Sequence, residues 1–436
     1  MNAAARFIST RDAAHGAGFS AAIQQGLAPD GGLYVPASWP AAPSAPASQD
    51  GELAGLGLRL LAPFVAADPL ESALPAITDE AFNFPAPLVT LDREAKLSLL
   101  ELFHGPTAAF KDFGARFLAA ALARVPRAGG RVLNMLVATS GDTGGAVAAA
   151  FHERSGMQVT VLFPKGLVSP TQQRQLTCWG GNVASFAVRG RFDDCQRLVK
   201  EALQAPDLRA RCDLSSANSI NLGRLLPQMV YYAAASLALH REHGERAGFI
   251  IPSGNLGNAL ACIWARRLGL PIGDIVLAHN ANRTVAEYLQ TGLWHPRPSI
   301  ATLASAMDVG NPSNMERLRS LFPGMPELHA AVSADSVDDE AIRRRIRAAF
   351  SDWGRFLCPH TAVAAEVYAR LPAVRRRASS WVIVATAHAA KFREIVEPLI
   401  GEEVPVPQSL MRLFARPTAF TEIPANLEGL RAALNA

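Results

Sequence analysis

The sequence of 436 residues predicts an α/β protein in which parallel sheets carry helices on both faces. Two observations support this fold class. After residue 96, continuous apolar runs of strand length alternate with helical segments of about ten or more residues, an alternation that is typical of parallel sheets. Apolar residues make up 49% of the chain and charged residues only 18%, which indicates a large packed core.

The first part of the chain differs from the rest and predicts a mostly helical region with a small β element. The segment 19–27, FSAAIQQGL, predicts a helix that ends at Gly26, and the apolar triplet 33–35 between turns predicts a short strand. Residues 36–46 are rich in Pro, Ala and Ser and are expected to form a connecting loop. From 52 to 84, apolar residues recur at spacings of three and four, which predicts further helices.

The remainder is expected to form two α/β domains, 96–240 and 241–436, after an N-terminal region 1–95. Strands are expected at 97–103, 131–138, 158–163, 182–188, 248–251, 275–278 and 381–386. Helices are expected from Lys111 onward and at 145–151, 170–178, 192–202, 221–240, 255–269, 283–290, 361–370 and 391–400. Residues 293–360 contain many Pro, Asn and Ser and are expected to be less regular.

Charge and cysteine usage narrow the class of protein. The net charge of +4 is small for this length, and no basic run is long enough to follow a nucleic acid, so no nucleic-acid partner is expected. The five cysteines form no CxxC pair and have no metal-like spacing with histidine, so we expect reduced thiols, no metal site and a cytoplasmic location. The N-terminus has no apolar core of signal-peptide length, and no run of 18 apolar residues occurs in the sequence, so no membrane association is expected.

One lysine, Lys111, lies where a predicted strand, an HGPT turn and a predicted helix meet. Phe110 and Phe113 flank it in the sequence. Aromatic walls exclude water, which lowers the pKa of a lysine and leaves its nitrogen free for Schiff-base chemistry. The alternative is a surface lysine on an amphipathic helix, which is the usual position of this residue type.

Three loops each follow a predicted strand and open a helix, where backbone N–H groups and the helix dipole can bind an anion. The loop 139–144, TSGDTG, offers two hydroxyls and free amides to a carboxylate. The loop 253–258, SGNLGN, suits a phosphate better, because Gly254 and Gly257 allow a close approach. A third loop spans 386–388. Each loop could instead be a purely structural turn.

A fourth cluster, SANSINLGR at 216–224, precedes a predicted long helix. It combines three neutral donors with one cation, in the order Asn218, Ser219, Asn221 and Arg224. A guanidinium with amides at the start of a helix suits a second phosphate. Ordinary N-capping is the alternative, because Asn and Ser are favoured at that position.

Five motifs in this order, HGPTAAFKDFGARF, ATSGDTGGAV, SANSINLGR, PSGNLGN and ATAHAAKF, resemble those of the threonine synthases of the long microbial type. The segments GLAPDGGLYVP and ATLASAMDVGNPSN are also similar to that family. The resemblance extends from about residue 8 to 430. It implies the fold-type II architecture of pyridoxal-phosphate enzymes, with two parallel-sheet α/β domains after a mostly helical N-terminal region.

The resemblance also implies a role for each candidate residue. Lys111 matches the catalytic lysine that forms a Schiff base with pyridoxal 5'-phosphate, and Thr386 matches a hydroxyl that faces the pyridine nitrogen. The loop matching the one that holds the cofactor phosphate consists of Gly254, Asn255, Leu256, Gly257 and Asn258. The residues matching substrate-binding segments are Ser140, Gly141, Asp142, Thr143, Asn218, Ser219, Asn221 and Arg224.

Two residues keep alternative interpretations. The place of Asp142 is usually taken by Asn in shorter relatives, where the amide can donate to the phenolic oxygen of the cofactor. An ionised Asp142 would repel that oxygen, so the carboxyl is expected either to be protonated or to be turned away. His104, which follows the strand before Lys111, is expected either to assist catalysis or to be structural.

The function that the resemblance implies is a carbon–oxygen lyase acting on a phosphate. Its substrate is O-phosphohomoserine, which loses phosphate from Cγ and gains water at Cβ to give L-threonine, while Arg224 stabilises the leaving phosphate. A monomer or homodimer is expected. Alternatives are a phospho-lyase that releases 2-oxobutyrate, an amino-acid dehydratase and a non-catalytic cofactor-binding protein. The cluster from Asn218 to Arg224 favours a phosphorylated substrate over that of a dehydratase, and Lys111 with both glycine loops favours catalysis.

Overall fold

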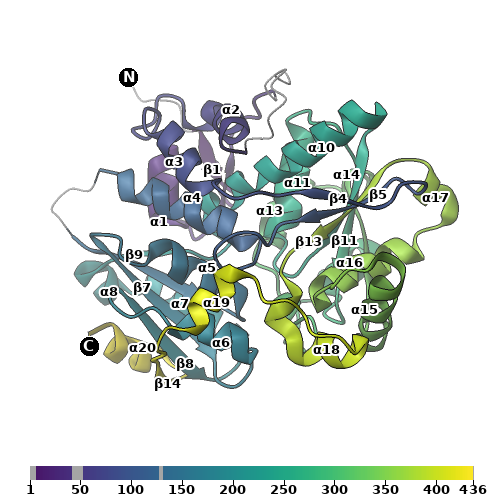
Figure 1. Cartoon of the computed structure of the whole chain (residues 1–436). Coiled ribbons are helices and arrows are strands. Elements are labelled where there is room, and N and C mark those ends of the chain that lie inside the picture. The colour runs from purple at the N-terminus through teal and green to yellow at the C-terminus, as the bar shows by residue number, and fades with distance from the viewer. Residues whose placement is uncertain (1–5, 42–52, 127–130, 436) are drawn as a thin grey trace.

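The computed structural model describes residues 6–41, 53–126 and 131–435. The chain forms two large sheets that lie side by side and a small N-terminal region above one of them (Figure 1). The loop expected at 36–46 falls partly outside the described residues. Within these ranges, no helix combines the length and the apolar character needed to cross a membrane.

The N-terminal region packs three helices against a small antiparallel sheet of strand order β2-β1-β3. Its elements are β1 (Phe7–Ser9), β2 (Gly16–Ala17), α1 (Phe19–Gln25), β3 (Tyr34–Pro36), α2 (Leu53–Val65) and α3 (Leu74–Ala81). Gly26 ends α1 with φ of +74°, a conformation that glycine adopts without strain, so the predicted helix end is confirmed. Phe7 is fully buried between Phe19 and Phe64, which joins the sheet to the helices.

A five-stranded parallel sheet has the order β14-β8-β7-β6-β9. Its strands are β6 (Leu133–Ala138), β7 (Met157–Pro164), β8 (Val183–Arg189), β9 (Asp213–Ser216) and β14 (Thr421–Pro424). Successive side chains of β6 pack into two separate apolar clusters, with Met135 and Val137 in one and Leu136 and Ala138 in the other. The unbroken apolar run therefore reflects a strand that is buried on both faces, as the sequence predicted.

Helices cover this sheet, and the C-terminal end of the chain packs beside it. They are α5 (Asp142–Phe151), α6 (Pro170–Thr177), α7 (Phe192–Gln204), α8 (Pro206–Arg211), α19 (Gln408–Phe414) and α20 (Leu427–Asn435). Ser169 and Gln172 form a capping box at the start of α6, which satisfies two backbone donors at once.

The second large sheet has six strands in the order β12-β11-β10-β13-β5-β4. They are β4 (Leu88–Asp92), β5 (Leu97–Glu101), β10 (Ala247–Pro252), β11 (Ile272–His279), β12 (Ser333–Ser336) and β13 (Trp381–Ala385). All neighbours are parallel except β4 and β5, which form an antiparallel hairpin at one edge. The central strands β10 and β13 are completely buried.

Helices pack around the six-stranded sheet and between the two sheets. They are α4 (Lys111–Arg124), α10 (Met229–His243), α11 (Gly257–Arg267), α12 (Thr284–Thr291), α13 (Met315–Leu321), α14 (Met325–Ala331), α15 (Asp339–Trp353), α16 (Pro359–Arg370), α17 (Ala373–Arg377) and α18 (Arg393–Ile400). The C-terminal segment runs from α18 across both halves to α20, in yellow in Figure 1.

Three regions, 1–95, 96–240 and 241–436, were expected as domains, and that division stays a prediction. Hydrogen-bonded sheets cross the boundary between the second and the third of these regions. β5 follows residue 96 but pairs with β13 in the six-stranded sheet, whereas β14 lies near the C-terminus and pairs with β8 in the five-stranded sheet. Each half of the molecule therefore contains segments from distant parts of the chain.

The continuous helix predicted over 221–240 is wrong. The chain forms α9 (Leu222–Leu225), a 3-10 turn (Leu226–Gln228) and then α10. Pro227 lies at the break, because it has no N–H to donate and its ring clashes with the carbonyl of the preceding helical turn. A similar 3-10 turn, Ala389–Phe392, precedes α18 where one helix over 391–400 was expected.

The region 293–360 is more regular than its composition indicated, because it contains the fifteen-residue helix α15. This helix has many arginines, but Ala341, Ile342, Ile346 and Ala349 recur on one face and are buried. The Asp338 side chain accepts a hydrogen bond of 2.8 Å from the N–H of Ala341 and caps the helix.

Candidate active site

A cavity lies between the two large sheets, at the carboxyl ends of β6, β10 and β13, where ligands of parallel α/β sheets bind. It brings together most of the residues predicted from the sequence. Among the residues lining it are Lys111, Ser140, Asp142, Thr143, Asn218, Ser219, Arg224, Gly254, Asn255, Leu256, Gly257, Asn258 and Thr386. Gly141 and Asn221 do not line it.

Lys111 is the first residue of α4 and is exposed only in part. The segment before it is fixed by backbone pairing to the end of β13, because Phe110 donates to the carbonyl of Thr386 over 2.9 Å. The ammonium lies 5.6 Å from the centre of the Phe110 ring, as expected for an aromatic wall. Phe113 does not line the cavity. It is fully buried against Phe84 instead, so its predicted contact with Lys111 is wrong.

Burial lowers the pKa of Lys111 to about 8. Asp142 opposes this shift with its negative charge, while Lys391 and Arg224 add to it. An amine with such a pKa is unprotonated often enough near neutral pH to act as a nucleophile and as a base. The chemistry predicted for Lys111 is therefore possible at this position.

The TSGDTG loop is held by the side chain of Thr139 and by one glycine. Oγ1 of Thr139 accepts hydrogen bonds from the N–H groups of Gly141 and Gly144, at 2.9 Å and 2.8 Å. Gly141 has φ of +134°, and a Cβ there would overlap the side chain of Gln172. Ser140 and Thr143 consequently face the cavity at the start of α5, where a carboxylate could bind.

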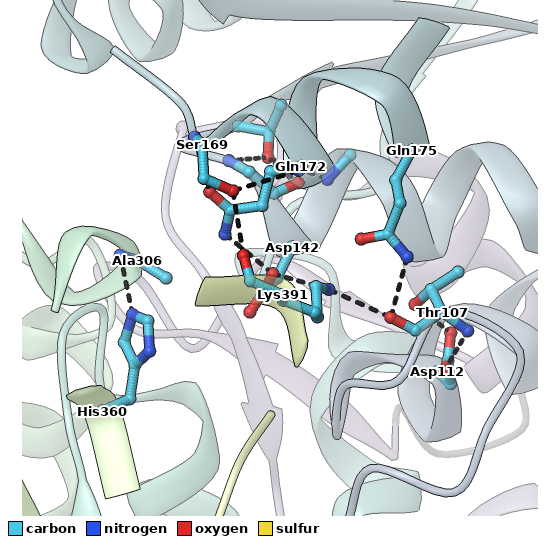
Figure 2. Close-up of polar contacts among 12 residues, drawn as sticks. Thr107, Asp112, Asp142, Ser169, Gln172, Gln175, Ala306, His360 and Lys391 are labelled. Carbon is cyan, nitrogen blue, oxygen red and sulfur yellow. Dashed lines mark hydrogen bonds and ion pairs between the residues drawn. The ribbon is translucent and has the colours of Figure 1, made fainter. Parts of the chain in front are cut away.

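Asp142 forms a buried ion pair with Lys391 (Figure 2), whose Nζ lies 2.7 Å from Oδ1 of the carboxylate. Nε2 of Gln172 donates to the same oxygen over 2.9 Å. Burial raises the pKa of Asp142, but the charges of Lys391 and Lys111 outweigh it and hold the pKa well below its usual range. Of the two states expected from the sequence, protonation is therefore wrong, and the carboxylate is turned toward Lys391.

The SGNLGN loop joins β10 to α11 and fits closely against its neighbours. A Cβ at Gly254 would lie 2.8 Å from Cα of Met307, so only glycine fits there. Leu256 adopts φ of +63°, a strained conformation for this residue type that directs the chain into the first turn of α11. Asn258 accepts hydrogen bonds from Tyr231 and Tyr232, while its Nδ2 has no partner among the described residues.

In the cluster 216–224, two asparagines have structural roles. The side chain of Asn218 accepts a hydrogen bond of 3.0 Å from the N–H of Ala138 and donates one of 2.7 Å to its carbonyl. It thereby extends the pairing of β6 with β9. Asn221 is fully buried outside the cavity and caps α9 through the N–H of Gly223. The prediction that Asn221 contacts a substrate phosphate is therefore wrong, because helix capping uses its side chain.

Arg224 is the cation of this cluster and lines the cavity while 2% exposed. Its Nη1 donates to the carbonyl of Ala217, and its Nε has no partner among the described residues. No carboxylate of the described ranges forms an ion pair with it. Burial lowers its pKa to about 10, with Asp112 opposing, so Arg224 remains charged near neutral pH.

Thr386 directly follows β13 and lines the cavity. Thr386 does not cap the following turn, because His388 occupies the cap and its Nδ1 accepts from the N–H of Ala390 over 3.1 Å. His104 does not line the cavity. Its Nε2 pairs with Oε2 of Glu101 over 2.8 Å, which favours the structural role.

Sequence reasoning missed two residues of this site. His360, at the start of α16, lines the cavity, and its Nε2 accepts from the N–H of Ala306 over 3.0 Å. Burial lowers its pKa to about 4, so it is neutral near pH 7. Lys391 lies behind Asp142. Its only sequence signal was its place in the ATAHAAKF motif, whereas His360 had none.

The cavity fits a cofactor that has both an aldehyde and a phosphate. Lys111 supplies an amine, the loop at the N-terminus of α11 supplies backbone N–H groups, and Nδ2 of Asn258 is an unpaired donor among the described residues. Residues 80–387 match the family described as pyridoxal-phosphate dependent enzymes, which defines the class of the protein and its cofactor, pyridoxal phosphate.

Flanking segments narrow this class. Residues 6–82 match the model of the threonine synthase N terminus, and residues 361–434 match that of the threonine synthase C-terminal part. The chain belongs to the threonine synthase family. It is 39% identical over 420 residues to threonine synthase of Haemophilus influenzae, with 95% of this chain and 96% of that protein covered.

Solved structures agree with this assignment. Threonine synthase from Escherichia coli superposes with a TM-score of 0.88 at 34% identity and covers 98% of this chain and 99% of its own. The pyridoxal-phosphate-bound threonine synthase from Brucella melitensis gives the same TM-score at 33% identity, with 99% of both chains covered. The predicted fold-type II architecture is thereby confirmed.

Proposed function

We propose that this enzyme converts O-phosphohomoserine and water into L-threonine and phosphate, with pyridoxal phosphate bound through Lys111. One observation carries the proposal. The cavity contains two separate features for anions, the SGNLGN loop at the start of α11 and the buried cation of Arg224. A cofactor phosphate on the loop leaves Arg224 for the phosphate of a substrate.

Cofactor binding is assigned to residues from three elements. The phosphate would be held by the loop that offers the backbone N–H groups at the start of α11, which consists of Gly254, Asn255, Leu256, Gly257 and Asn258. Thr386 lines the cavity and would offer a neutral hydroxyl to the pyridine nitrogen. When bound, the cofactor supplies an electron sink for negative charge at the α and β carbons of the substrate.

Lys111 acts as the base of the reaction. With its pKa lowered to about 8, its nitrogen can accept the α and β protons of the substrate and return protons to the γ and α carbons. The bond from Cγ to the phosphate oxygen breaks, and phosphate leaves with the bonding electrons. Water then provides the hydroxyl of Cβ, and the added proton completes the methyl group at Cγ.

Substrate recognition uses the remaining residues of the cavity. The hydroxyls of Ser140 and Thr143, with the free N–H groups that start α5, are assigned to the substrate carboxylate. Arg224 and the side chain of Ser219 are assigned to its phosphate. A desolvated guanidinium stabilises the charge of a departing phosphate, a contribution that is often the largest in catalysis.

Product analysis tests the proposal. Purified enzyme loaded with pyridoxal phosphate should release equal amounts of threonine and phosphate from O-phosphohomoserine. A yield of 2-oxobutyrate and phosphate would identify a phospho-lyase instead, and no phosphate release would refute both. The Lys111→Ala variant is the control for non-enzymatic breakdown. A cytoplasmic location and a monomeric or dimeric state remain predictions.

A further inference from the structure

Lys391 is fully buried, and the proposed reaction does not use it. Its ammonium contacts two groups, Oδ1 of Asp142 at 2.7 Å and the carbonyl of Thr107 at 3.0 Å (Figure 2). Nε2 of Gln175 also donates to the carbonyl of Thr107, over 3.0 Å. Lys391 thus connects the turn before Lys111 to the first residue of α5.

Hydrogen bonds to one oxygen fix the orientation of the carboxylate of Asp142. Its Oδ1 accepts from Lys391 and from Gln172, whereas no hydrogen bond to its Oδ2 is found within the described ranges. Because Asp142 lines the cavity, its negative charge acts on whatever the cavity holds. The amine of Lys111, whose proton takes part in the proposed reaction, is one of the groups that feel this charge.

Charged groups from several elements face these residues. Asp142 of α5, Lys391 of the turn before α18 and Arg224 of α9 act on Lys111. Lys391, Lys111 and His360 of α16 act on Asp142. Asp112 of α4 also faces Lys391, but both its oxygens accept hydrogen bonds from Thr107, at 2.8 Å and 2.7 Å.

We propose that Lys391 is a positioning residue for the reaction, whose ammonium fixes Asp142 as a carboxylate in the cavity wall and cancels much of its field at Nζ of Lys111. This inference rests on the proposed role of Lys111 as the cofactor lysine. Two opposite charges 2.7 Å apart form a dipole whose field falls off faster than that of one charge. The proton on Nζ is then governed by burial more than by either charge.

This arrangement predicts that the two single substitutions change the proton affinity of Nζ of Lys111 in opposite directions. Asp142→Asn removes the anion and leaves the cation of Lys391, which disfavours a proton on Nζ of Lys111. Lys391→Gln leaves the anion, which favours that proton. The double variant Asp142→Asn/Lys391→Gln removes both charges, so the proton on Nζ should titrate close to its wild-type pH, whatever the change in turnover. A purely structural role predicts instead that both single variants lose activity without opposite shifts.

The test follows the proton on Nζ by two measurements in the holoenzyme. One is the pH midpoint of the absorbance change of the bound cofactor, and the other is the acidic limb of the kcat profile, where Lys111 must be unprotonated to act as base. Asp142→Asn should lower both by about one pH unit or more, and Lys391→Gln should raise them similarly. The double variant should lie within about half a unit of the wild type.

A surface ion pair supplies the matched control. Lys165→Gln disrupts the pair of 2.6 Å between Lys165 and Glu422, and it should move neither measurement. If Lys391→Gln does not fold, Asp142→Asn and the double variant still test the proposed role of Lys391. The double variant is expected to fold because it leaves neither partner of the ion pair as an unpaired buried charge. Unshifted values for Asp142→Asn, or shifts of both single variants in the same direction, would overturn the proposal.

Borohydride reduction and peptide mapping of the wild type test the role of Lys111 separately from that of Lys391. A cofactor label on Lys111 with unshifted profiles overturns the role of Lys391 alone. A label on any other lysine overturns the proposed role of Lys111 and that of Lys391 together.

Discussion

The side-chain amide of Asn255 donates a hydrogen bond of 2.8 Å to the hydroxyl of Ser219, and this contact joins the two segments assigned to phosphates. The same hydroxyl accepts from Asn314 over 3.0 Å. A Cβ at Gly257 would lie 3.2 Å from Cβ of Ser219, so the segments are packed directly on each other. Two anions bound to these segments would therefore lie next to each other. Arg224 belongs to only one segment, so its removal should weaken the binding of one anion and not of the other.

Arg224→Ala should weaken substrate use without removing the cofactor. We expect kcat/KM for O-phosphohomoserine to fall by about two to three orders of magnitude, because a desolvated charged contact contributes roughly 3–4 kcal/mol. Cofactor occupancy, measured by absorbance, should stay nearly unchanged. Arg319→Ala on the exposed face of α13 is the matched control. A folded but colourless Arg224→Ala protein would mean that Arg224 holds the cofactor phosphate instead.

Lys111→Ala should abolish the covalent attachment of pyridoxal phosphate and almost all turnover, because no other amine is assigned to the cofactor. The visible absorbance of the bound cofactor and the covalent label that remains after borohydride reduction measure this. Lys165→Ala at the surface should leave both unchanged. A covalent cofactor that persists in Lys111→Ala would refute the assignment.

Thr386→Asp should keep the fold and the cofactor while it changes the spectrum. A carboxylate facing the pyridine nitrogen holds a proton on it, whereas a hydroxyl does not, so the absorbance, its pH dependence and the product ratio should all change. Thr386→Ser keeps the hydroxyl and serves as the control. An unchanged spectrum in Thr386→Asp would remove Thr386 from the cofactor site.

Gly141→Ala should lower stability and activity more than the same substitution at Gly166, another glycine with a positive φ. The added methyl overlaps Gln172, which donates to Asp142, and the backbone is strained by roughly 1–3 kcal/mol. We expect a lower Tm together with a reduced kcat/KM. Gly166→Ala is the control, since its φ is +72° but nothing lies within 4 Å of the added carbon. Equal losses in the two variants would contradict the close contact with Gln172.

Acidification should destabilise the enzyme through the buried His360 and the half-buried His388. His360 and His388 each accept a hydrogen bond from a backbone N–H, which a protonated ring cannot do. Burial lowers the pKa of each to about 4, with His104 adding to the effect at His388. The unfolded chain, whose histidines titrate near 6.5, therefore binds more protons between about pH 6.5 and 4, and stability falls as the pH falls through that window.

His388→Asn isolates one of these contributions, because asparagine accepts the same cap hydrogen bond without titrating. Urea unfolding at about pH 7 and about pH 5 should show a smaller loss of stability for the variant than for the wild type. His295→Asn, at an exposed position, should behave like the wild type. An equal acid loss in His388→Asn would show that His388 does not contribute.

Local patterns in the sequence determined the fold class and most elements of this protein. Apolar runs such as 133–138 identify strands that are buried on both faces, and Gly26 identifies a helix end, because these features depend on neighbouring residues alone. The ordered motifs identified the family and placed Lys111, Thr386 and both glycine loops. The comparisons confirm the family, and the cavity contains these residues.

Tertiary structure alone decided how those residues act. The sequence does not reveal that Lys391 lies 2.7 Å from Asp142, or that Asn221 caps a helix while Arg224, three residues later, faces the cavity. The pairing of β5 and β14 with strands distant in sequence was equally hidden. The physical reason is that ionisation depends on burial and on charges from separate elements, which meet only after the chain has folded.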